Sequence, residues 1–223
     1  MKTSILAVNY YGDKFRDLLI ESIKKNQSEE CEILIYDNSN PENIGHAKAM
    51  DILVKQAQGK YIFTFDIDAH VMLEDFDKKI IAHYESQNDK DIDGRFRLIA
   101  GEGGLLKPAR PCCMFFEKEF FINNEMSFES KNCDGAKFDV GVHFYFKTLS
   151  LGYKVGFFKY AKTEYKDVTG NEYLFNGERF CYHHWYATRW FNVFGKRVHD
   201  KIDSMTFESW EKSTNNLFNQ ING

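Results

Sequence analysis

The chain lacks the cysteine patterns that mark a disulfide framework or a structural zinc site. It has five cysteines, an odd number, with no CxxC spacing and with Cys112 and Cys113 adjacent. Small secreted domains held by disulfides show an even number of regularly spaced cysteines. The run Cys181-Tyr-His183-His184 supplies half of a zinc ligand set, but no second pair has matching spacing. The pattern favours a reducing compartment, so we expect a cytoplasmic protein.

Long hydrophobic runs are also missing. No window approaches the roughly 20 apolar residues that cross a bilayer. The short apolar run at residues 5–8 turns polar too soon for the apolar core of a signal peptide. We therefore expect no integral membrane segment, and transient contact with a membrane substrate stays open.

An excess of basic residues is the third absence. Lysine and arginine number 29 against 33 acidic residues, a net charge of −4, so we expect no nucleic acid as a partner. A mildly acidic chain can still bind a small polyanion where a metal ion neutralises it locally.

With 223 residues, 43% of them hydrophobic, the chain suits one domain with a sizeable core. We predict a single domain over residues 1–199, with halves at 1–95 and 96–199, and a peripheral helix or tail at 200–223.

What is present is a regular alternation of strand and helix in the first half. Short apolar runs that end in polar loop residues predict buried strands, and apolar residues at helical spacing between them predict amphipathic helices. Because this order is typical of a parallel sheet covered on both faces, we predict an α/β fold with its ligands at the carboxyl ends of the strands. The predicted strands lie at residues 5–8, 32–36 and 61–65, and the polar clusters that follow them at 9–12, 37–40 and 66–68.

The cluster after the third strand carries two carboxylates, Asp66 and Asp68, spaced i, i+2. On extended backbone this spacing points both side chains the same way, so they can share a divalent cation. Hard oxygen ligands suit Mg²⁺ or Mn²⁺, with substrate phosphates completing the shell. Two solvated acids at a strand end are the alternative, and the convergence of three polar strand ends favours the metal site.

The order of these motifs resembles glycosyltransferase family 2, of the GT-A (nucleotide-diphospho-sugar transferase) fold. The resemblance covers about the first 75 residues well and continues more loosely to about residue 158. It implies a mostly parallel central sheet with helices on both faces, a nucleotide-sugar donor and an acceptor hydroxyl. The motifs that carry it are Val8-Asn9-Tyr10-Tyr11-Gly12, Tyr36-Asp37-Asn38-Ser39, Asn43-Ile44-Gly45 and Gly59-Lys-Tyr-Ile-Phe-Thr-Phe-Asp66-Ile-Asp68.

The resemblance also implies roles for individual residues at the donor site. Asp37 is expected at the base edge, and Lys48 lies where the family often carries a basic residue facing the donor. Asp66 is expected near the ribose and the metal, and Asp68 as a direct metal ligand. The residues expected to line the base and ribose are Asn9, Tyr10 and Tyr11.

The family usually places a pair of acids ahead of a helix in the second half, and one carboxylate deprotonates the acceptor. Here the matching helix begins with a single acid, Asp139, which becomes the candidate catalytic base. The chemistry requires a carboxylate within hydrogen-bond reach of the acceptor hydroxyl. The alternative is that Asp139 only caps the helix N-terminus. Glu129 and Asp134 are the nearby substitutes.

A late histidine in many enzymes of this fold reaches the metal or the diphosphate. His183 and His184 are the candidates here, with His184 preferred as a metal ligand. Imidazole ligation favours Mn²⁺ over Mg²⁺. Arg189 is a candidate for neutralising the departing diphosphate. The aromatic neighbours Trp185, Tyr186 and Trp190 suit either sugar stacking or core packing.

Other functions fit parts of the pattern. The segment 63–68 also resembles the first motif of haloacid-dehalogenase-type phosphatases, although two strand–helix units precede it here. A nucleotidyltransferase is a second alternative, and a catalytically degenerate glycan- or nucleotide-binding module is a third. The sequence leaves the donor open among UDP-, GDP- and dTDP-sugars, and the acceptor among a glycan, a lipid-linked glycan and a protein.

Overall fold

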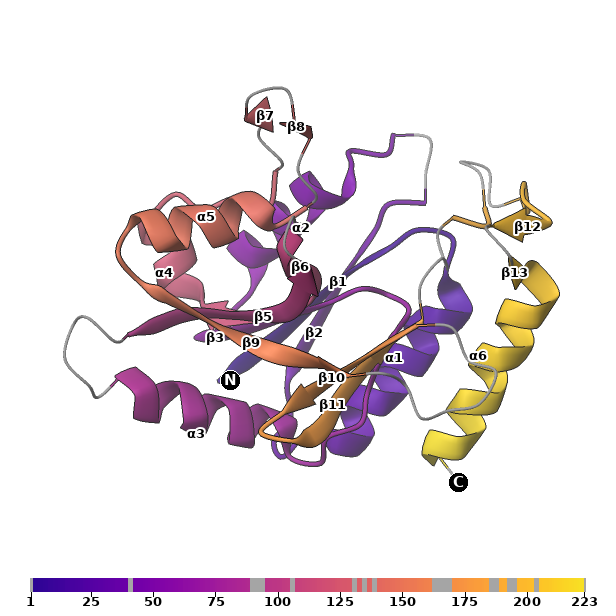
Figure 1. Ribbon diagram of the computed structural model, residues 1–223, viewed down its shortest axis with the longest axis horizontal. Coiled ribbons are helices and arrows are strands. Elements are labelled where there is room, and N and C mark those ends of the chain that lie inside the picture. The colour runs from indigo at the N-terminus through magenta and orange to yellow at the C-terminus, as the bar shows by residue number, and fades with distance from the viewer. Residues whose placement is uncertain are drawn as a thin grey trace.

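The computed structural model describes residues 2–39, 42–88, 95–104, 107–129, 132–133, 136–137, 140–161, 170–184, 189–191, 196–202 and 205–222. Strand and helix alternate through the first half, as predicted (Figure 1). The elements of this half are β1 (Thr3–Asn9), α1 (Asp13–Asn26), β2 (Glu32–Asp37), α2 (His46–Gln56), β3 (Tyr61–Phe65), β4 (Ala69–Val71) and α3 (Phe76–Asn88).

The second half contributes most of the longer strands. The central ones are β5 (Phe96–Gly104) and β6 (Lys107–Glu117). The remaining elements are α4 (Lys118–Asn123), β7 (Asn132–Cys133), β8 (Ala136–Lys137), α5 (Val142–Ser150), β9 (Lys154–Ala161), β10 (Asn171–Phe175), β11 (Glu178–His183), β12 (Lys201–Ile202), β13 (Met205–Thr206) and α6 (Phe207–Asn222).

One 9-stranded sheet organises the molecule, in the order β2-β1-β3-β6-β5-β9-β10-β11-β4. Its parallel pairs are β1 with β2, β1 with β3, and β5 with β9. The other neighbours pair antiparallel. Among them, β10 and β11 are joined by a short turn, which permits only that direction. The predicted α/β fold is confirmed, with the parallel part of the sheet concentrated in the N-terminal strands and a mixed sheet beyond them.

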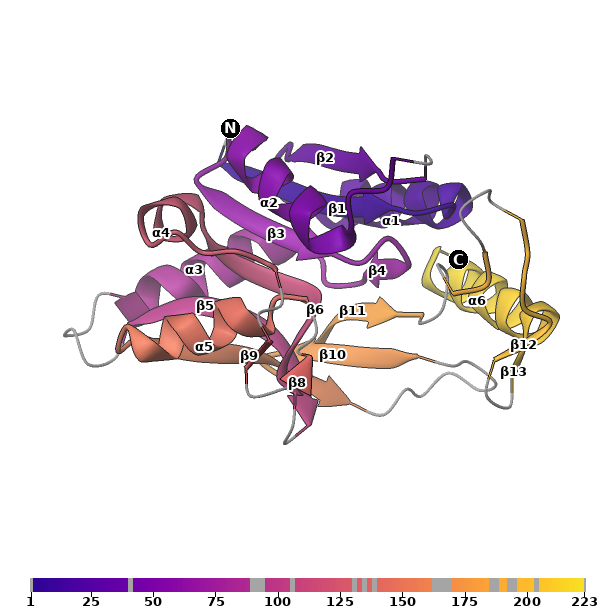
Figure 2. The same cartoon turned by 90° about the horizontal axis from the view of Figure 1, so that it is seen from above.

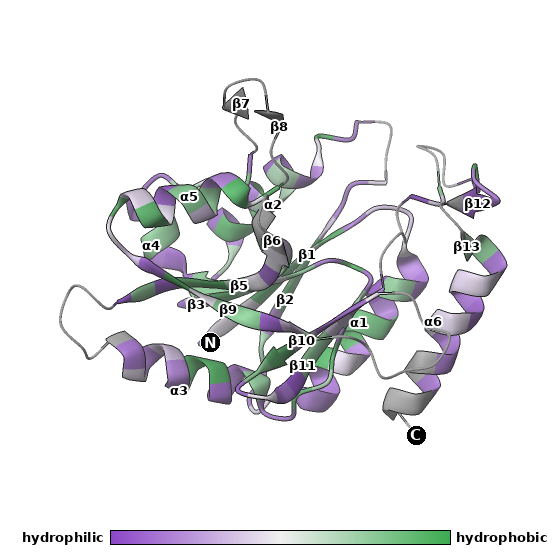
Figure 3. Cartoon of the chain, viewed as in Figure 1, coloured by the Kyte–Doolittle hydropathy of each residue, from purple (hydrophilic) through white to green (hydrophobic). Residues whose placement is uncertain are grey.

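Alternation along the strands divides the core into two layers. Ile5 and Phe63 face the side covered by α1 and α3, whereas Leu6 and Ile62 face α2, α4 and α5. Helices therefore cover both faces of the sheet, which explains why the strands are hydrophobic on successive residues. Figure 1 shows α2, α4 and α5 on one side of the sheet and α1 and α3 on the other, and Figure 2 shows the same arrangement from above. The hydropathy colouring of Figure 3 shows the hydrophobic central strands.

The C-terminal segment ends in a packed helix. Trp210 of α6 is 1% exposed and packs with Phe15 of α1 and with Trp190, whose side chain is fully buried. This small cluster joins α6 to the side of the molecule that carries α1 (Figure 1). The aromatic Trp190 is therefore core. The division of the chain into the predicted domain ranges stays a prediction.

None of the described helices is long and apolar enough to cross a membrane.

Candidate functional site

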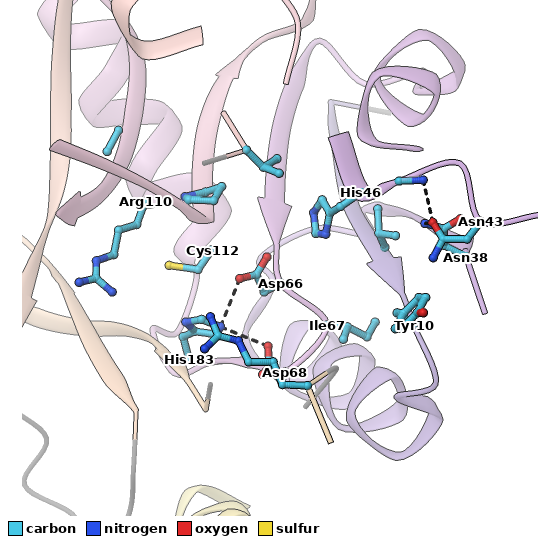
Figure 4. Close-up of a pocket in the computed structure, with 16 residues that line it drawn as sticks. Tyr10, Asn38, Asn43, His46, Asp66, Ile67, Asp68, Arg110, Cys112 and His183 are labelled. Atoms are coloured by element: carbon cyan, nitrogen blue, oxygen red, sulfur yellow. Dashed lines mark hydrogen bonds and ion pairs between the residues drawn. The ribbon is translucent and has the colours of Figure 1, made fainter. Parts of the chain in front are cut away.

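The site lies where the first three strands end. β1 ends at Asn9, β2 at Asp37 and β3 at Phe65, and their parallel alignment brings the three following loops to one edge of the sheet. A cavity of about 710 Å³ opens there, within the range usual for small-molecule sites. The described residues that line it are Val8, Tyr10, Asn38, Asn43, Gly45, His46, Asp66, Ile67, Asp68, Ala109, Arg110, Pro111, Cys112, Val140, His183 and Arg189 (Figure 4).

Asp66 and Asp68 occupy the short connection between β3 and β4. Backbone hydrogen bonds hold this connection, because Asp66 N–H donates to the carbonyl oxygen of Cys112 over 3.1 Å and Ala69 N–H donates to that of Asp66 over 3.0 Å. The Asp68 side chain is 7% exposed and that of Asp66 is 24% exposed. Both carboxylates line the cavity, and so does Ile67 between them. Residues 66–68 form a turn, and not the extended strand end on which the i, i+2 prediction relied.

A histidine from the far end of the chain joins the two carboxylates. β11 pairs antiparallel with β4, and this pairing sets His183 opposite Ala69. His183 Nε2 lies 3.2 Å from Asp66 Oδ2 and 3.2 Å from Asp68 Oδ1. One ligand atom from each of the three residues lies within 4.8 Å of the others. Two carboxylate oxygens and one imidazole nitrogen form a donor set that fits a divalent metal ion such as Mn²⁺.

The electrostatics of this cluster are those of a cation site. Burial opposes the charged form of His183, but the charge of Asp68 and hydrogen bonds to both carboxylates outweigh it and raise its pKa well above the usual value. Burial likewise opposes ionisation of Asp66, and His183 outweighs this effect and lowers its pKa. A proton on His183 thus supplies the positive charge that a metal ion would supply between the two carboxylates. Binding of a metal there requires His183 to release its proton.

The structure places His183 at the two carboxylates, and not His184, which the sequence favoured as a metal ligand. Successive residues of an extended chain point to opposite sides, so His183 faces the cavity and His184 faces the interior. His184 is fully buried, and its Nε2 lies 2.5 Å from His70 Nδ1. It also contacts the rings of Tyr182 and Phe15. His184 therefore belongs to the packing behind the metal cluster.

Asn9 stabilises the loop that follows β1. Its Oδ1 accepts from Gly12 N–H over 3.1 Å and its Nδ2 donates to Asp13 over 2.9 Å, and the residue is 1% exposed. Tyr11 has φ 55°, and its N–H donates to Ser39 Oγ over 2.7 Å. Tyr10 is the member of the predicted trio that lines the cavity. The loop geometry therefore presents Tyr10 to a ligand and uses Asn9 to hold the turn.

Asp37 and Lys48 were predicted to contact the nucleotide-sugar donor, but neither is among the described residues that line the cavity. Asp37 is exposed, and its carboxylate accepts from Ser39 N–H over 3.0 Å. Lys48 is exposed on α2. The basic side chain of this helix that lines the cavity is His46 in the first turn, because two residues of a helix rotate the direction by about 200°. His46 rather than Lys48 thus faces the cavity, and the donor contacts of Asp37 and Lys48 stay predictions.

Asn38 and Asn43 lie at the same edge of the sheet. Both belong to motifs that carry the family resemblance, but no role was predicted for either. Asn38 Nδ2 donates to Asn43 Oδ1 over 2.9 Å, and Asn38 Oδ1 accepts from Ile44 N–H over 3.0 Å. Both residues line the cavity. Arg110 also lines it and was not predicted. The signal for Asn38 and Asn43 lies in their motifs, whereas nothing local marks Arg110.

Arg189 lines the cavity, as its predicted role near the diphosphate requires. Asp139, Asp134, Trp185 and Tyr186 lie outside the described residues. The helix α5 begins after Gly141, which has φ 78° and serves as the N-cap, and Val140 lines the cavity. The role of Asp139 as base therefore stays a prediction.

Comparison with known proteins supports the family resemblance. Residues 39–141 match the model of Glycosyl transferase family 2. The match confirms the resemblance on which the GT-A fold was expected, and it supports the expectation that the chain is a glycosyltransferase. A search of the curated proteins finds no match.

The chain is also similar to solved structures at low identity. S. aureus TarS is 16% identical, with a TM-score of 0.45, over 58% of this chain and 30% of that one. The mannosyltransferase PcManGT from Pyrobaculum calidifontis, in complex with GDP-Man and Mn²⁺, is 11% identical, with a TM-score of 0.49, over 70% and 54%. A Drosophila β-1,4-galactosyltransferase 7 mutant, in complex with manganese, UDP-Gal and xylobiose, is 11% identical, with a TM-score of 0.48, over 96% and 79%. The chain thus spans less than two thirds of the length of the first two.

Proposed function

We propose that the chain is a metal-dependent glycosyltransferase that moves a sugar from a nucleoside-diphosphate donor to an acceptor hydroxyl, with inversion at the anomeric carbon. The observation that carries the proposal is the Asp66, Asp68 and His183 cluster in the wall of the cavity where three strands end. The family match over residues 39–141 supports the same reaction class. A cytoplasmic location, favoured by the irregular cysteine pattern, completes the proposal.

The cavity suits a nucleotide-sugar donor, with the nucleoside at one side and the diphosphate beside the carboxylates. Tyr10 and Asn38 offer a ring and an amide for the nucleoside at one side. Asp66, Asp68 and His183 would hold Mn²⁺, with Mg²⁺ as the alternative, beside the diphosphate. When bound, the ion supplies Lewis-acid stabilisation of the negative charge on the diphosphate.

Side chains of the protein add to this stabilisation. Arg189 and His46 line the same cavity. A guanidinium that donates hydrogen bonds to phosphate oxygens stabilises the leaving diphosphate. His46 lies close enough to Asp66 to lower the pKa of that carboxyl, after the larger effects of burial and of His183. It is therefore placed beside the carboxylates rather than at the rim.

The acceptor is activated by a carboxylate in this proposal. Asp139 immediately precedes Val140, which lines the cavity. Asp139 would accept the proton of the acceptor hydroxyl as the oxygen attacks the anomeric carbon from the side opposite the diphosphate. The bond between the anomeric carbon and the diphosphate oxygen breaks in the same step, so configuration inverts.

Calorimetric titration of UDP and GDP in the presence and absence of Mn²⁺ tests the proposal. We expect nucleotide binding that depends on the metal in the wild type and is lost in Asp68→Asn. Asp17→Asn is the matched control, because Asp17 is an exposed acid on α1, away from the cavity. Donor turnover, followed as release of nucleoside diphosphate from UDP- and GDP-sugars, completes the test.

Unchanged Mn²⁺-dependent nucleotide binding in Asp68→Asn would remove the metal assignment. Retention of the donor's anomeric configuration in the product, seen by NMR, would overturn the single displacement. Hydrolysis of phosphomonoesters without a sugar nucleotide would favour the phosphatase alternative instead.

A further inference from the structure

Two asparagines in the wall of the cavity hold each other in fixed orientations. Asn38 Oδ1 accepts from Ile44 N–H over 3.0 Å, and Asn38 Nδ2 donates to Asn43 Oδ1 over 2.9 Å. Asn43 Oδ1 also accepts from Gly45 N–H over 2.7 Å. Because a backbone N–H can only donate, each amide has to turn its oxygen toward that N–H, which determines how both side chains are oriented.

The amide of Asn43 is therefore occupied at its oxygen and available at its nitrogen. Its oxygen receives two hydrogen bonds, one for each lone pair. No acceptor in the described part of the chain pairs with Asn43 Nδ2. Asn38 is 3% exposed, whereas Asn43 is exposed, and both line the cavity. Toward a ligand, the Asn43 side chain thus offers two N–H donors and no acceptor.

Asn43 lies on the nucleoside side of the cavity in the proposed function, on which this inference rests. In Figure 4, Asn43 lies beside Asn38 and near Tyr10, and His46 lies between this group and Asp66. With the diphosphate at the metal cluster, the nucleobase occupies the side of the cavity that carries Tyr10 and Asn43. The donor groups of Asn43 consequently meet the edge of the base.

An amide that can only donate distinguishes between nucleobases. Uracil, thymine and guanine carry a keto oxygen where cytosine and adenine carry an amino group. An asparagine with both amide atoms available pairs with adenine by donating and accepting at once. Asn43 has no acceptor left for an amino group, so a base that presents one would leave N–H groups facing each other without partners.

We propose that Asn43 determines the specificity of this enzyme for a nucleotide with a keto base, by donating from Nδ2 to the keto oxygen. Asn38 is a positioning residue in this role, because its own Nδ2 and the N–H of Gly45 together fix the orientation of the Asn43 amide. The contact is with the base, so it sets nucleotide preference and leaves the binding of Mn²⁺ and of the diphosphate intact.

Two pairs of nucleotides test the proposal, UDP against CDP and GDP against ADP, because each pair exchanges a keto for an amino group at constant charge. Their Kd values are measured by calorimetric titration at saturating Mn²⁺, with inorganic pyrophosphate as a probe of the diphosphate contacts alone. The variants are Asn43→Asp, which replaces the NH2 group with a second oxygen, and Asn43→Ala. The control is Asn123→Asp, the same change at an exposed residue of α4 that does not line the cavity.

We expect the wild type to prefer the keto member of one pair by about tenfold to hundredfold, the cost of leaving a donor unpaired. The pair that shows the preference identifies the base. In Asn43→Asp the preference should fall at least about tenfold, because the new oxygen accepts from the amino group. The ratio of two nucleotides of equal charge cancels the repulsion that the added carboxylate causes. Asn43→Ala should lose the preference with pyrophosphate affinity unchanged, and Asn123→Asp should keep it.

Three results would overturn the inference. One is a wild type that shows no keto preference in either pair. Another is an undiminished keto preference in Asn43→Asp or in Asn43→Ala. The last is an equal loss of affinity for all four nucleotides and pyrophosphate in Asn43→Ala, which would make Asn43 a diphosphate or structural residue. A wild type that binds no nucleotide with Mn²⁺ would instead refute the proposed function itself, and the inference with it.

Discussion

The backbone N–H of His184 donates to the carbonyl oxygen of Asp68 over 3.0 Å. This bond continues the β11–β4 ladder, which joins the connection after β3 to a strand from the far end of the chain. The neighbouring side chain, His183, consequently lies 3.2 Å from Asp68 Oδ1. Backbone pairing therefore assembles the three groups of the proposed metal site, and the sheet holds them in place before any ligand binds.

The two adjacent histidines should respond differently to truncation. His183→Ala removes one ligand atom, so we expect Mn²⁺ affinity to fall at least about tenfold with the fold retained. His184→Ala removes a fully buried ring, so we expect a loss of about 3 kcal/mol in the free energy of unfolding. Mn²⁺ titration and urea denaturation measure the two effects. A His183→Ala variant with the Mn²⁺ affinity of the wild type would contradict the assignment of His183 as a metal ligand.

The carboxylates of this site were predictable from sequence, and the histidine was not. Asp66 and Asp68 follow a buried strand, at the sheet edge where three polar strand ends were predicted to converge. Which of His183 and His184 joins them depends on the register between β11 and β4, a pairing of distant segments. β4 has only three residues, too few for a periodic pattern.

A similar limit applies to the part of the cavity that α2 lines. The helix α2 was predicted from its periodicity, but the direction of each side chain depends on how the helix rotates against the sheet. That rotation places His46 in the cavity and Lys48 in solvent. Arg110 depends on a ladder break that only the pairing of β5 with β6 reveals. The fold class, in contrast, could be predicted without long-range information, from the alternation of the first three strands with helices.

His46 and Lys48 offer a direct test of that rotation. His46→Ala should raise the Kd for the Mn²⁺-dependent nucleotide roughly threefold to tenfold, the effect of one lost hydrogen bond. Lys48→Ala should leave the Kd unchanged, because its side chain is exposed and away from the described cavity wall. Isothermal titration measures both. The reverse order of effects would restore Lys48 as the donor contact.

Cys31 should show an unusual pH dependence of alkylation. Burial, with the nearby charges of Asp77 and Glu29, raises the pKa of its thiol to about 12. The reactive thiolate is therefore scarce at neutral pH, and its fraction grows about tenfold with each pH unit up to that value. Iodoacetamide labelling of the native protein from pH 7 to 10, read by peptide mass spectrometry, should rise without a plateau. A plateau near pH 9, as for an unperturbed cysteine, would contradict this prediction.

The C-terminal helix should support the metal site through Trp210. Its indole N–H donates to the carbonyl oxygen of His184 over 3.4 Å, and its ring packs 4.9 Å from that of Phe15. Trp210→Phe keeps the ring and loses the donor, so we expect a cost of about 1 kcal/mol in the free energy of unfolding. Trp210→Ala also empties a buried site, and we expect about 3–5 kcal/mol.

Loss of the Trp210 contact should also weaken Mn²⁺ binding. Trp210 holds the backbone of His184, and His183 immediately precedes that residue. We expect Mn²⁺ affinity to fall in the order wild type, Trp210→Phe, Trp210→Ala, measured at a temperature where circular dichroism shows each variant folded. Lys212→Ala, an exposed change on the same helix, should match the wild type in both stability and affinity. A folded Trp210→Ala with wild-type Mn²⁺ affinity would show that α6 stabilises the domain without positioning His183. A graded loss would place the C-terminal helix among the elements that shape the metal site.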